Sequence, residues 1–324
     1  MFEYFLRRLL YAVPIVFGVM LLTFVLFFMV QSPKIMAKRI LGPKATPQAV
    51  ENWMHNRGYD KPRFYNTTPG QKWHDSQFFN HIWSLATFDL GKSDATGEPV
   101  IAKFKKGAIP SLLITVPAFV LGFAFSLAIA LFLAFVRKSM LDVGGVIACV
   151  VLMSITIMVY VILGQWVIAV QMSWLPAFGF NPSGLSTLKF LILPVVVYVA
   201  AGLGGDVRLY RAIFLEEVHQ DYVRTAQAKG ASHERVLFLH VLKNGMISLI
   251  TLVVSSLPFL IMGSLVIENF FGIPGLGSLT IDAIRTSDFA VVRAAVYLGS
   301  LLYLSGLLLT DLCYAAVDPR IRFK

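Results

Sequence analysis

Few side chains in this sequence have the types and spacing that chemistry requires. The string Ala86-Thr87-Phe88-Asp89-Leu90-Gly91-Lys92-Ser93 ends like a phosphate-binding loop, but alanine stands where the first glycine of that motif belongs. His55, His74 and His81 lie in the same segment at spacings of 19 and 7 residues, which match no zinc pattern. We therefore expect a turn of a folded segment at residues 86–93, surface histidines, and no metal site.

Covalent catalysis within the apolar segments is also disfavoured. Such a mechanism needs a nucleophile with a base within hydrogen-bond reach, and these segments contain no histidine and no paired carboxylates. The two cysteines, Cys149 and Cys313, both lie in apolar segments, so no disulfide framework is expected. The sequence predicts that the chain is not an enzyme and has no catalytic residues.

The elements that must position the remaining polar residues are membrane helices. Of the 324 residues, 57% are hydrophobic and 14% are charged, whereas soluble domains carry about 25% charged residues. About 20 apolar residues are needed for a helix to cross the hydrocarbon core, and six segments are suitable: 9–30, 111–136, 143–170, 185–205, 246–267 and 291–317. We expect an all-α, polytopic membrane bundle of six transmembrane helices.

The basic residues of the short loops predict the orientation of this bundle. If the N-terminus is cytoplasmic, thirteen Lys and Arg residues lie in inner loops and termini, and three lie in short outer loops. The other twelve lie in residues 31–107, a segment too long to direct topology. Both termini are therefore predicted to be cytoplasmic. The net charge of +10 is explained by the membrane, and no nucleic-acid partner is expected.

Three regions follow from this topology. Residues 1–30 form the N-terminal segment and first span, and residues 31–107 form a small folded insertion on the outer side. That insertion is punctuated by prolines and carries aromatic side chains available for packing, at Trp53, Tyr59, Trp73 and Trp83. Residues 108–324 form the core, with a cytoplasmic loop at residues 206–245.

The cytoplasmic loop is predicted to contain two helices separated by a break. Val218, Tyr222 and Ala226 are spaced like one face of a helix, and Gly230 can end that helix in the left-handed conformation. Asp221 is suited to cap its beginning. Six basic and five acidic residues nearly balance in this loop, which favours a protein partner over a lipid surface.

Several motifs of the chain resemble one known family. They are Asp221–Ser232, His240–Gly245, Leu6–Leu10 with Pro14, Phe88–Ser93, Pro274–Gly277 and Asp311–Arg322. Together they resemble the dipeptide and oligopeptide B-type permease subunits of ATP-binding cassette importers, and the resemblance runs nearly end to end.

This resemblance implies a multi-pass protein of the bacterial cytoplasmic (inner) membrane. Its implied partners are a second homologous permease subunit, two ATPase subunits that carry ATP and Mg²⁺, a periplasmic or lipid-anchored substrate-binding protein, and a peptide substrate. The chain itself is expected to bind no cofactor. It would form half of the translocation pathway and work by alternating access.

The resemblance also implies a coupling helix that docks on an ATPase. In the wider class its motif is Glu-Ala-Ala followed by Gly, but Arg224 and Thr225 stand at the Glu and first Ala positions here, and Ala226 matches. The residues assigned to ATPase coupling are Glu217, Asp221, Tyr222, Arg224, Thr225, Ala226, Lys229 and Gly230.

A second group of residues is assigned to the pathway or to its gating. Pro258 can allow the fifth span to bend, and Glu268 lies at the mouth of the path or marks an interface. Pro274, Gly275 and Gly277 belong to a glycine-rich run that predicts an outer turn or short re-entrant element. Asp311 is as suited to capping or pairing with a terminal arginine as to transport.

Two alternatives stay open at this point. The same kind of machine could import nickel, an oligosaccharide or a peptide antibiotic, because the binding protein does most of the selecting. A secondary carrier or channel would work without ATPases. Carriers usually need midplane carboxylates or broken helices, and neither is evident in this sequence.

Overall fold

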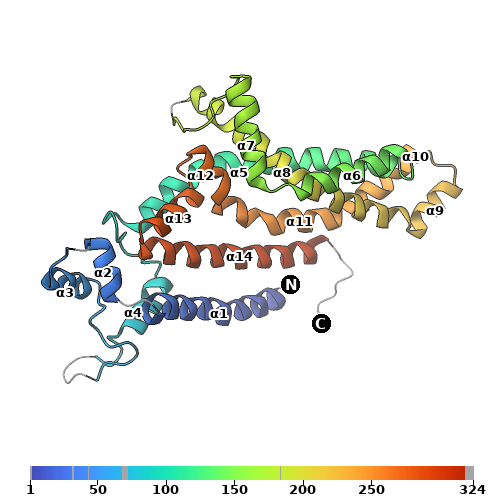
Figure 1. Cartoon of the computed structure of the whole chain (residues 1–324). Helices are drawn as coiled ribbons and strands as arrows, with labels where there is room; N and C mark the ends of the chain where they lie inside the picture. Colours follow the sequence, from blue (N-terminus) through green and yellow to red (C-terminus); the bar gives the residue numbers. More distant parts are fainter. Residues whose placement is uncertain (1, 31–32, 43, 68–71, 183, 318–324) are drawn as a thin grey trace. The chain divides into compact units, whose positions relative to one another are not determined.

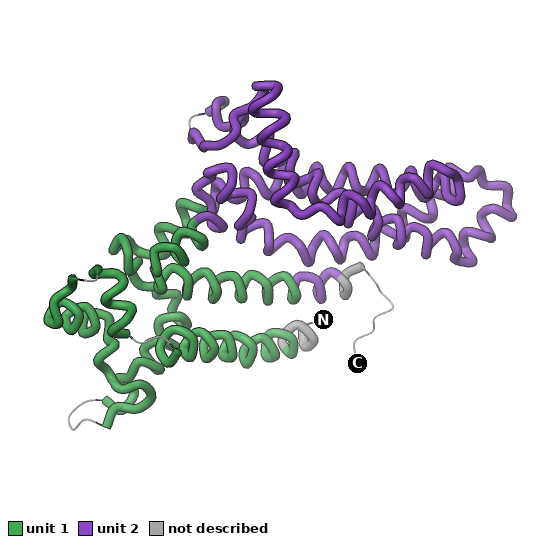
Figure 2. Tube along the Cα trace, in the orientation of Figure 1, with its two compact units in different colours: residues 1–107, 279–308, 323 green, residues 108–278, 309–322, 324 purple. Residues whose placement is uncertain are grey.

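The computed structural model describes residues 2–30, 33–42, 44–67, 72–182 and 184–317. These residues are predominantly helical, with one isolated antiparallel bridge between Lys92 and Pro99. They form two compact units, which are described separately: unit 1 contains residues 1–107 and 279–308, and unit 2 contains residues 108–278 and 309–322 (Figure 2).

Unit 1 combines the first span, the insertion, and most of the last span (Figure 1). Its elements are α1 (Phe2–Phe24), the π-helical η1 (Val25–Val30), α2 (Pro33–Leu41), α3 (Pro47–Asn56), α4 (Gln77–Ala86), the first turns of α5 (Val100–Phe135), most of α13 (Leu276–Arg285) and most of α14 (Phe289–Val317). The predicted insertion is therefore folded, and α5 begins at Val100, ahead of residue 108.

Unit 2 contains the rest of α5 and the other helices of the core. These are α6 (Met140–Ser154), α7 (Ile157–Gly164), the π-helical η2 (Gln165–Gln171), α8 (Leu185–Val218), α9 (Asp221–Ala228), α10 (His233–Val236), the π-helical η3 (Leu237–Val241), α11 (Leu242–Met262) and α12 (Leu265–Phe271). One apolar core joins α5, α6, α8, α9 and α11, with Phe214 and Leu249 fully buried in it.

Five helical stretches in the described residues are long and apolar enough to cross a membrane, and a bent pair makes a sixth if it counts as one span. The all-α polytopic bundle is thus confirmed, but a continuous third helix over residues 143–170 is wrong. Its two parts, Met140–Ser154 and Ile157–Gln171, meet at 91°.

The bend lies at two extended residues, Ile155 and Thr156. Tyr160 Oη donates a hydrogen bond to the Leu152 carbonyl, 2.8 Å away. That bond compensates for backbone pairing lost at the bend.

The insertion has an aromatic core against the end of the first span. Phe24 and Met36 are almost completely buried there, and the rings of Trp53 and Tyr59 stack at 5.5 Å. Trp73 and Trp83, which were also expected to pack, are 59% and 71% exposed. Trp73 still packs outside this core, with its ring centre 5.1 Å from that of Phe79 and 6.5 Å from that of Tyr65, whereas Trp83 lies on the surface.

The phosphate-loop-like string forms a turn, as predicted. Asp89 Oδ1 accepts a hydrogen bond from the Gly91 amide at 3.1 Å, and the buried Ser93 hydroxyl donates one to Asp288. Asp94 Oδ2 accepts from the Ala290 amide at 3.0 Å, in the first turn of α14. Asp94 thereby pairs a helix-start amide that has no partner within the helix, so the residues that follow the turn support α14.

One of the three histidines is not on the surface. His81 is 4% exposed, and its Nε2 lies 3.1 Å from both the Met20 carbonyl oxygen and Thr23 Oγ1. The prediction of surface histidines is wrong here because α4 packs this face against α1. Burial, together with the nearby Arg293 charge, lowers the pKa of His81 to about 3.

This burial predicts an acid-sensitive insertion. The folded pKa is lowered, so the unfolded chain binds the proton more tightly, and stability present above about pH 6.5 is lost as pH falls toward 3. At pH 5 the loss should reach about 2 kcal/mol, or a fall of about 5 °C in Tm. Thermal unfolding of the purified protein at pH 7.5 and pH 5 measures it. His81→Phe should reduce this pH dependence, and His74→Phe, at an exposed position, should leave it unchanged.

Candidate functional site: the coupling loop and the outer turn

The polar residues assigned to function lie at two ends of unit 2. Figure 1 shows α9 and α10 at one end of this unit and α12 at the other. The first end is the predicted cytoplasmic loop, and the second is the predicted outer turn.

The cytoplasmic end begins with an extension of the fourth span. Helix α8 continues to Val218, far beyond residue 205, and a short break at His219 and Gln220 leads into α9. Gln220 occupies the N-cap position, so the prediction that Asp221 caps this helix is wrong by one residue. Asp221 is the first helical residue, its side chain is 97% exposed, and Arg224 Nη1 lies 3.6 Å from its Oδ1.

Gly230 ends α9 in the left-handed conformation, as predicted. Its φ is +84°, its amide donates to the Gln227 carbonyl at 2.9 Å, and the Ala231 amide donates to the Ala226 carbonyl at 3.1 Å. These two bonds form a Schellman motif. The chain then re-enters a helix at Ser232, which caps α10 by accepting from the Arg235 amide.

The faces of α9 differ in what they contact. Val223 and Ala226 are buried in the chain's own core with Leu237, so Ala226 has a packing role. Tyr222 Oη donates a hydrogen bond to a Glu217 carboxylate oxygen, which ties α9 back to α8. Burial and this hydrogen bond raise the pKa of Tyr222 to about 12.

The exposed side of α9 carries the other assigned residues. Arg224, Thr225 and Lys229 are exposed. A depression of about 580 Å³ beside them runs from Tyr222 to His240. The structure thus brings the residues assigned to coupling together on α9 and at its two ends, beside an open flank, and their contact with an ATPase stays a prediction.

The left-handed end of α9 gives a measurable prediction. Gly230→Ala should destabilise this turn by about 1 kcal/mol, because a residue with a Cβ is strained at positive φ although nothing lies within 4 Å of the new methyl group. The matched control is Gly144→Ala in α6, where the Cβ also meets nothing and φ is helical. Hydrogen exchange of residues 221–231 should quicken about fivefold only in Gly230→Ala; equal rates in both variants would contradict the prediction.

The outer end of unit 2 is organised by one buried carboxylate. Glu268 is fully buried. Its Oε1 accepts from Ser111 Oγ at 2.7 Å and from the Ser264 amide at 3.1 Å, and its Oε2 accepts from the Gly277 and Ser278 amides at 2.7 and 3.1 Å. Ser111 Oγ in turn accepts from the Leu276 amide at 2.7 Å. Glu268 and Ser111 therefore cap the first turn of α13.

The glycines of the predicted turn allow this close approach. A Cβ at Gly275 would lie 2.2 Å from Glu268 Oε2, and a Cβ at Gly277 would lie 2.8 Å from the Ser264 backbone. Pro274 precedes them. Glu268, Gly275 and Gly277 thus meet in one structural cluster, whereas Pro258 lies separately within α11. A role of these residues in the pathway stays a prediction.

Sequence reasoning missed one strong ion pair in unit 2. Arg211 of α8 donates to both carboxylate oxygens of Asp142 at 2.8 Å, and the Lys138 amide donates to Asp142 Oδ2 at 3.0 Å. The Asp142 side chain is 8% exposed. The signal available in the sequence was an acidic residue directly at the start of an apolar segment.

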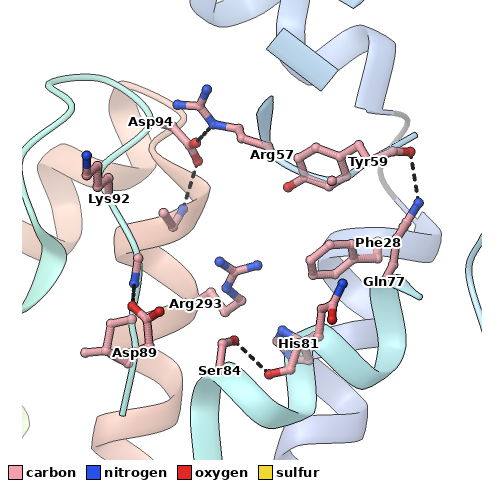
Figure 3. A pocket seen from close by; sticks show the side chains of 15 residues that line it. Phe28, Arg57, Tyr59, Gln77, His81, Ser84, Asp89, Lys92, Asp94 and Arg293 are labelled. Carbon is pink, nitrogen blue, oxygen red and sulfur yellow. Dashed lines mark hydrogen bonds and ion pairs between the residues drawn. The ribbon is translucent and has the colours of Figure 1, made fainter. Parts of the chain in front are cut away.

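Unit 1 has its own polar pocket of about 270 Å³, with Arg57, Asp94 and Arg293 in its lining (Figure 3). Arg57 Nε donates to Asp94 Oδ1 at 2.6 Å, and the Arg293 guanidinium lies 5.4 Å from the centre of the Phe28 ring. The pocket joins the motif segment after α4 to α14. Groups of three or more metal-ligating side chains are absent from the described part of the chain.

Comparison with known proteins identifies the family to which these elements belong. Residues 107–323 match the family described as binding-protein-dependent transport system inner membrane component, and residues 1–83 match the N-terminal region of such components. A glutathione transport system permease protein of Escherichia coli O6:H1 (strain CFT073) is 32% identical over 324 residues, covering all of both chains. A putative peptide transport system permease protein of Brucella abortus (strain 2308) is 31% identical over 325 residues, covering 98% of each.

The helical architecture and these matches agree. Apolar helices of the described residues are long enough for several membrane crossings, and the matched family covers more than half of the chain. The chain is therefore a multi-pass inner-membrane transport component, and it belongs to the inner-membrane-component family of binding-protein-dependent transport systems.

Proposed function

We propose that this chain is a permease subunit of an ATP-driven importer for di- or oligopeptides and forms half of its pathway. The cargo is proposed from the relatives, which are named for glutathione and peptide transport. The observation that supports the coupling role is α9, a short helix held to its own core by Val223 and Ala226 with an exposed flank. Such a helix can move as a rigid body together with the core that it contacts.

The proposed partners are a second permease subunit, two ATPase subunits and a substrate-binding protein. ATP and Mg²⁺ would be bound by the ATPase subunits. The binding protein would deliver peptide at the outer end, and ATP binding would move α9. Because Tyr222 is bonded to Glu217, motion of α9 is transmitted to the end of α8. Alternating access would follow from motion of the two spans that contain α8 and α11.

The first experiment is purification of the tagged chain from its native membrane in mild detergent, with native mass spectrometry to count the partners. We expect one different permease and two ATPase subunits. The assembly, reconstituted in vesicles with its binding protein, should then accumulate radiolabelled glutathione or short peptides only with ATP. A lone chain or homo-oligomer in several detergents would overturn the importer proposal, and uptake of other solutes alone would overturn the cargo.

A charge reversal on α9 tests the docking face. Arg224→Glu with Lys229→Glu should reduce co-purified ATPase at least tenfold, because these side chains are exposed and add little to the core. Glu51→Lys, an equally exposed change on α3, is the matched control. Retention of both ATPases by the α9 variant would show that this face does not dock them.

A further inference from the structure

A cavity of about 180 Å³ lies inside unit 2, between α5 and α8, with Leu260 of α11 also in its wall. On α8, its lining residues Tyr198, Gly202, Asp206 and Tyr210 follow one another at four-residue spacing, which places them on one face of the helix. Phe119 of α5 lies in the same lining. The cavity is thus mainly apolar, with several aromatic rings and one carboxylate in its wall.

Asp206 belongs to the helix and not to the loop. Sequence reasoning placed it as the first loop residue, but α8 continues through it, and it falls within the stretch Ser186–Val218 that qualifies as a membrane span. Ionisable residues in such stretches are costly and usually functional. The extension of α8 is what brings this carboxylate into the wall of a cavity.

The carboxylate of Asp206 has no hydrogen bond or ion pair with any other residue that the structure describes. The two arginines that follow it on α8 contact other residues. Arg211 is bound by both oxygens of Asp142, and Arg208 Nη1 lies 3.6 Å from the sulfur of Met153. Asp206 is also half-buried, so water solvates it only in part.

The wall of the cavity is suited to a cation. Asp206 is the one formally charged side chain among its described lining residues, and Phe119, Tyr198 and Tyr210 contribute aromatic rings to the same wall, a residue type whose ring faces attract ammonium groups. The Thr115 hydroxyl is already engaged with the Ser111 and Leu260 carbonyls at 2.9 and 2.7 Å. At about 30 Å³ per water molecule, the volume admits one end of a peptide.

We propose that Asp206 binds the primary ammonium group of a peptide during its passage through this subunit, with the aromatic rings of the cavity around it. This assignment rests on the proposed function and deepens it. It names a substrate-binding residue and a substrate feature, a free terminal amine. A carboxylate and a cation that meet in a partly dry site stabilise each other more than they would in water.

The test uses the complete reconstituted importer, loaded binding protein in excess, and the peptide that wild type takes up fastest, both free and N-acetylated. Asp206→Asn should reduce uptake of the free peptide at least tenfold and leave uptake of the acetylated peptide within about twofold. Asp206→Glu, which keeps the carboxylate, should retain uptake within about threefold. Glu51→Gln, an exposed carboxylate on α3, is the matched control.

The outcomes separate the two proposals. If wild type takes up no peptide although its ATPases turn over, the proposed cargo fails. If wild type takes up the free peptide and Asp206→Asn does so equally well, the ammonium site is overturned. Equal loss of free and acetylated peptide in Asp206→Asn, with normal ATP hydrolysis, assigns Asp206 a structural role and also overturns it. If the binding protein delivers no N-acetylated peptide, uptake of the free peptide by the two Asp206 variants is compared. Loss of uptake in Asp206→Asn but not in Asp206→Glu supports the ammonium site, and equal uptake by both variants overturns it.

Discussion

Replacing Glu268 with alanine should remove most of the folded protein from the membrane. The change deletes the acceptor for four hydrogen bonds in a fully buried site, three of them from backbone amides. Each buried donor left without a partner costs about 1–3 kcal/mol, so we expect a loss of about 4–5 kcal/mol, at the upper end for single substitutions. The apparent Tm of the purified assembly should fall by about 10 °C or more.

A matched pair of variants tests whether the carboxylate is the cause. Gly275→Ala should be similarly damaging, because its Cβ would lie 2.2 Å from Glu268 Oε2 and 2.5 Å from Ser111 Oγ. The double variant should lose much less than the sum of the two, since the new methyl group occupies space that Glu268 vacates. Gly18→Ala, where a Cβ meets nothing within 4 Å, is the control. Additive losses in the double variant would contradict this account.

Replacing Arg211 with alanine should have the second largest effect. It leaves the nearly buried Asp142 carboxylate without its bidentate partner, and breaking a buried pair from one side costs about 3–5 kcal/mol. Because α8 leads directly into α9, we also expect peptide uptake per ATP hydrolysed to fall at least threefold. Vesicle uptake and ATP hydrolysis, measured on the same preparation, check this expectation.

Two comparisons isolate the ion pair from a general effect on α8. Arg208→Ala, on the same helix but at an exposed position, should leave stability within about 0.5 kcal/mol. Arg211→Leu combined with Asp142→Leu should recover most of the stability, since replacing both partners of a buried pair with apolar residues is often neutral. If Arg208→Ala and Arg211→Ala behave alike, the pair has no special role.

The spans could be predicted because their signal is local. A long apolar run and the absence of charge define a membrane helix whatever it packs against. The break in the third span could not be predicted in this way, since residues 154–156 are Ser-Ile-Thr, which carry no charge and include no proline or glycine. Tyr160 Oη reaches the Leu152 carbonyl only because the bend brings them together. Hydropathy cannot show such a contact.

The candidate sites also differ in whether local sequence or distant contacts determine them. The left-handed end of α9 depends on one glycine and its neighbours, so sequence reasoning found it. The role of Glu268 depends on Ser111, which is distant in the sequence, and nothing local marks that serine as its partner. His81 was similarly taken for a surface residue because its burial depends on Met20 and Thr23 of α1. Tertiary contacts decided the cases of Glu268 and His81.

The bonds of Glu268 also have a kinematic consequence. One carboxylate holds Ser111 within α5, Ser264 before α12 and Gly277 in the first turn of α13, so it links these three segments to one another. Gly263, in the short break between α11 and α12, has no room for a side chain, because a Cβ there would lie 2.0 Å from Glu268 Oε1. Pro258, which lacks an amide donor within α11, is a further position at which this helix can bend. We therefore expect the segments bound to Glu268 to move together, with the glycine turn keeping its shape.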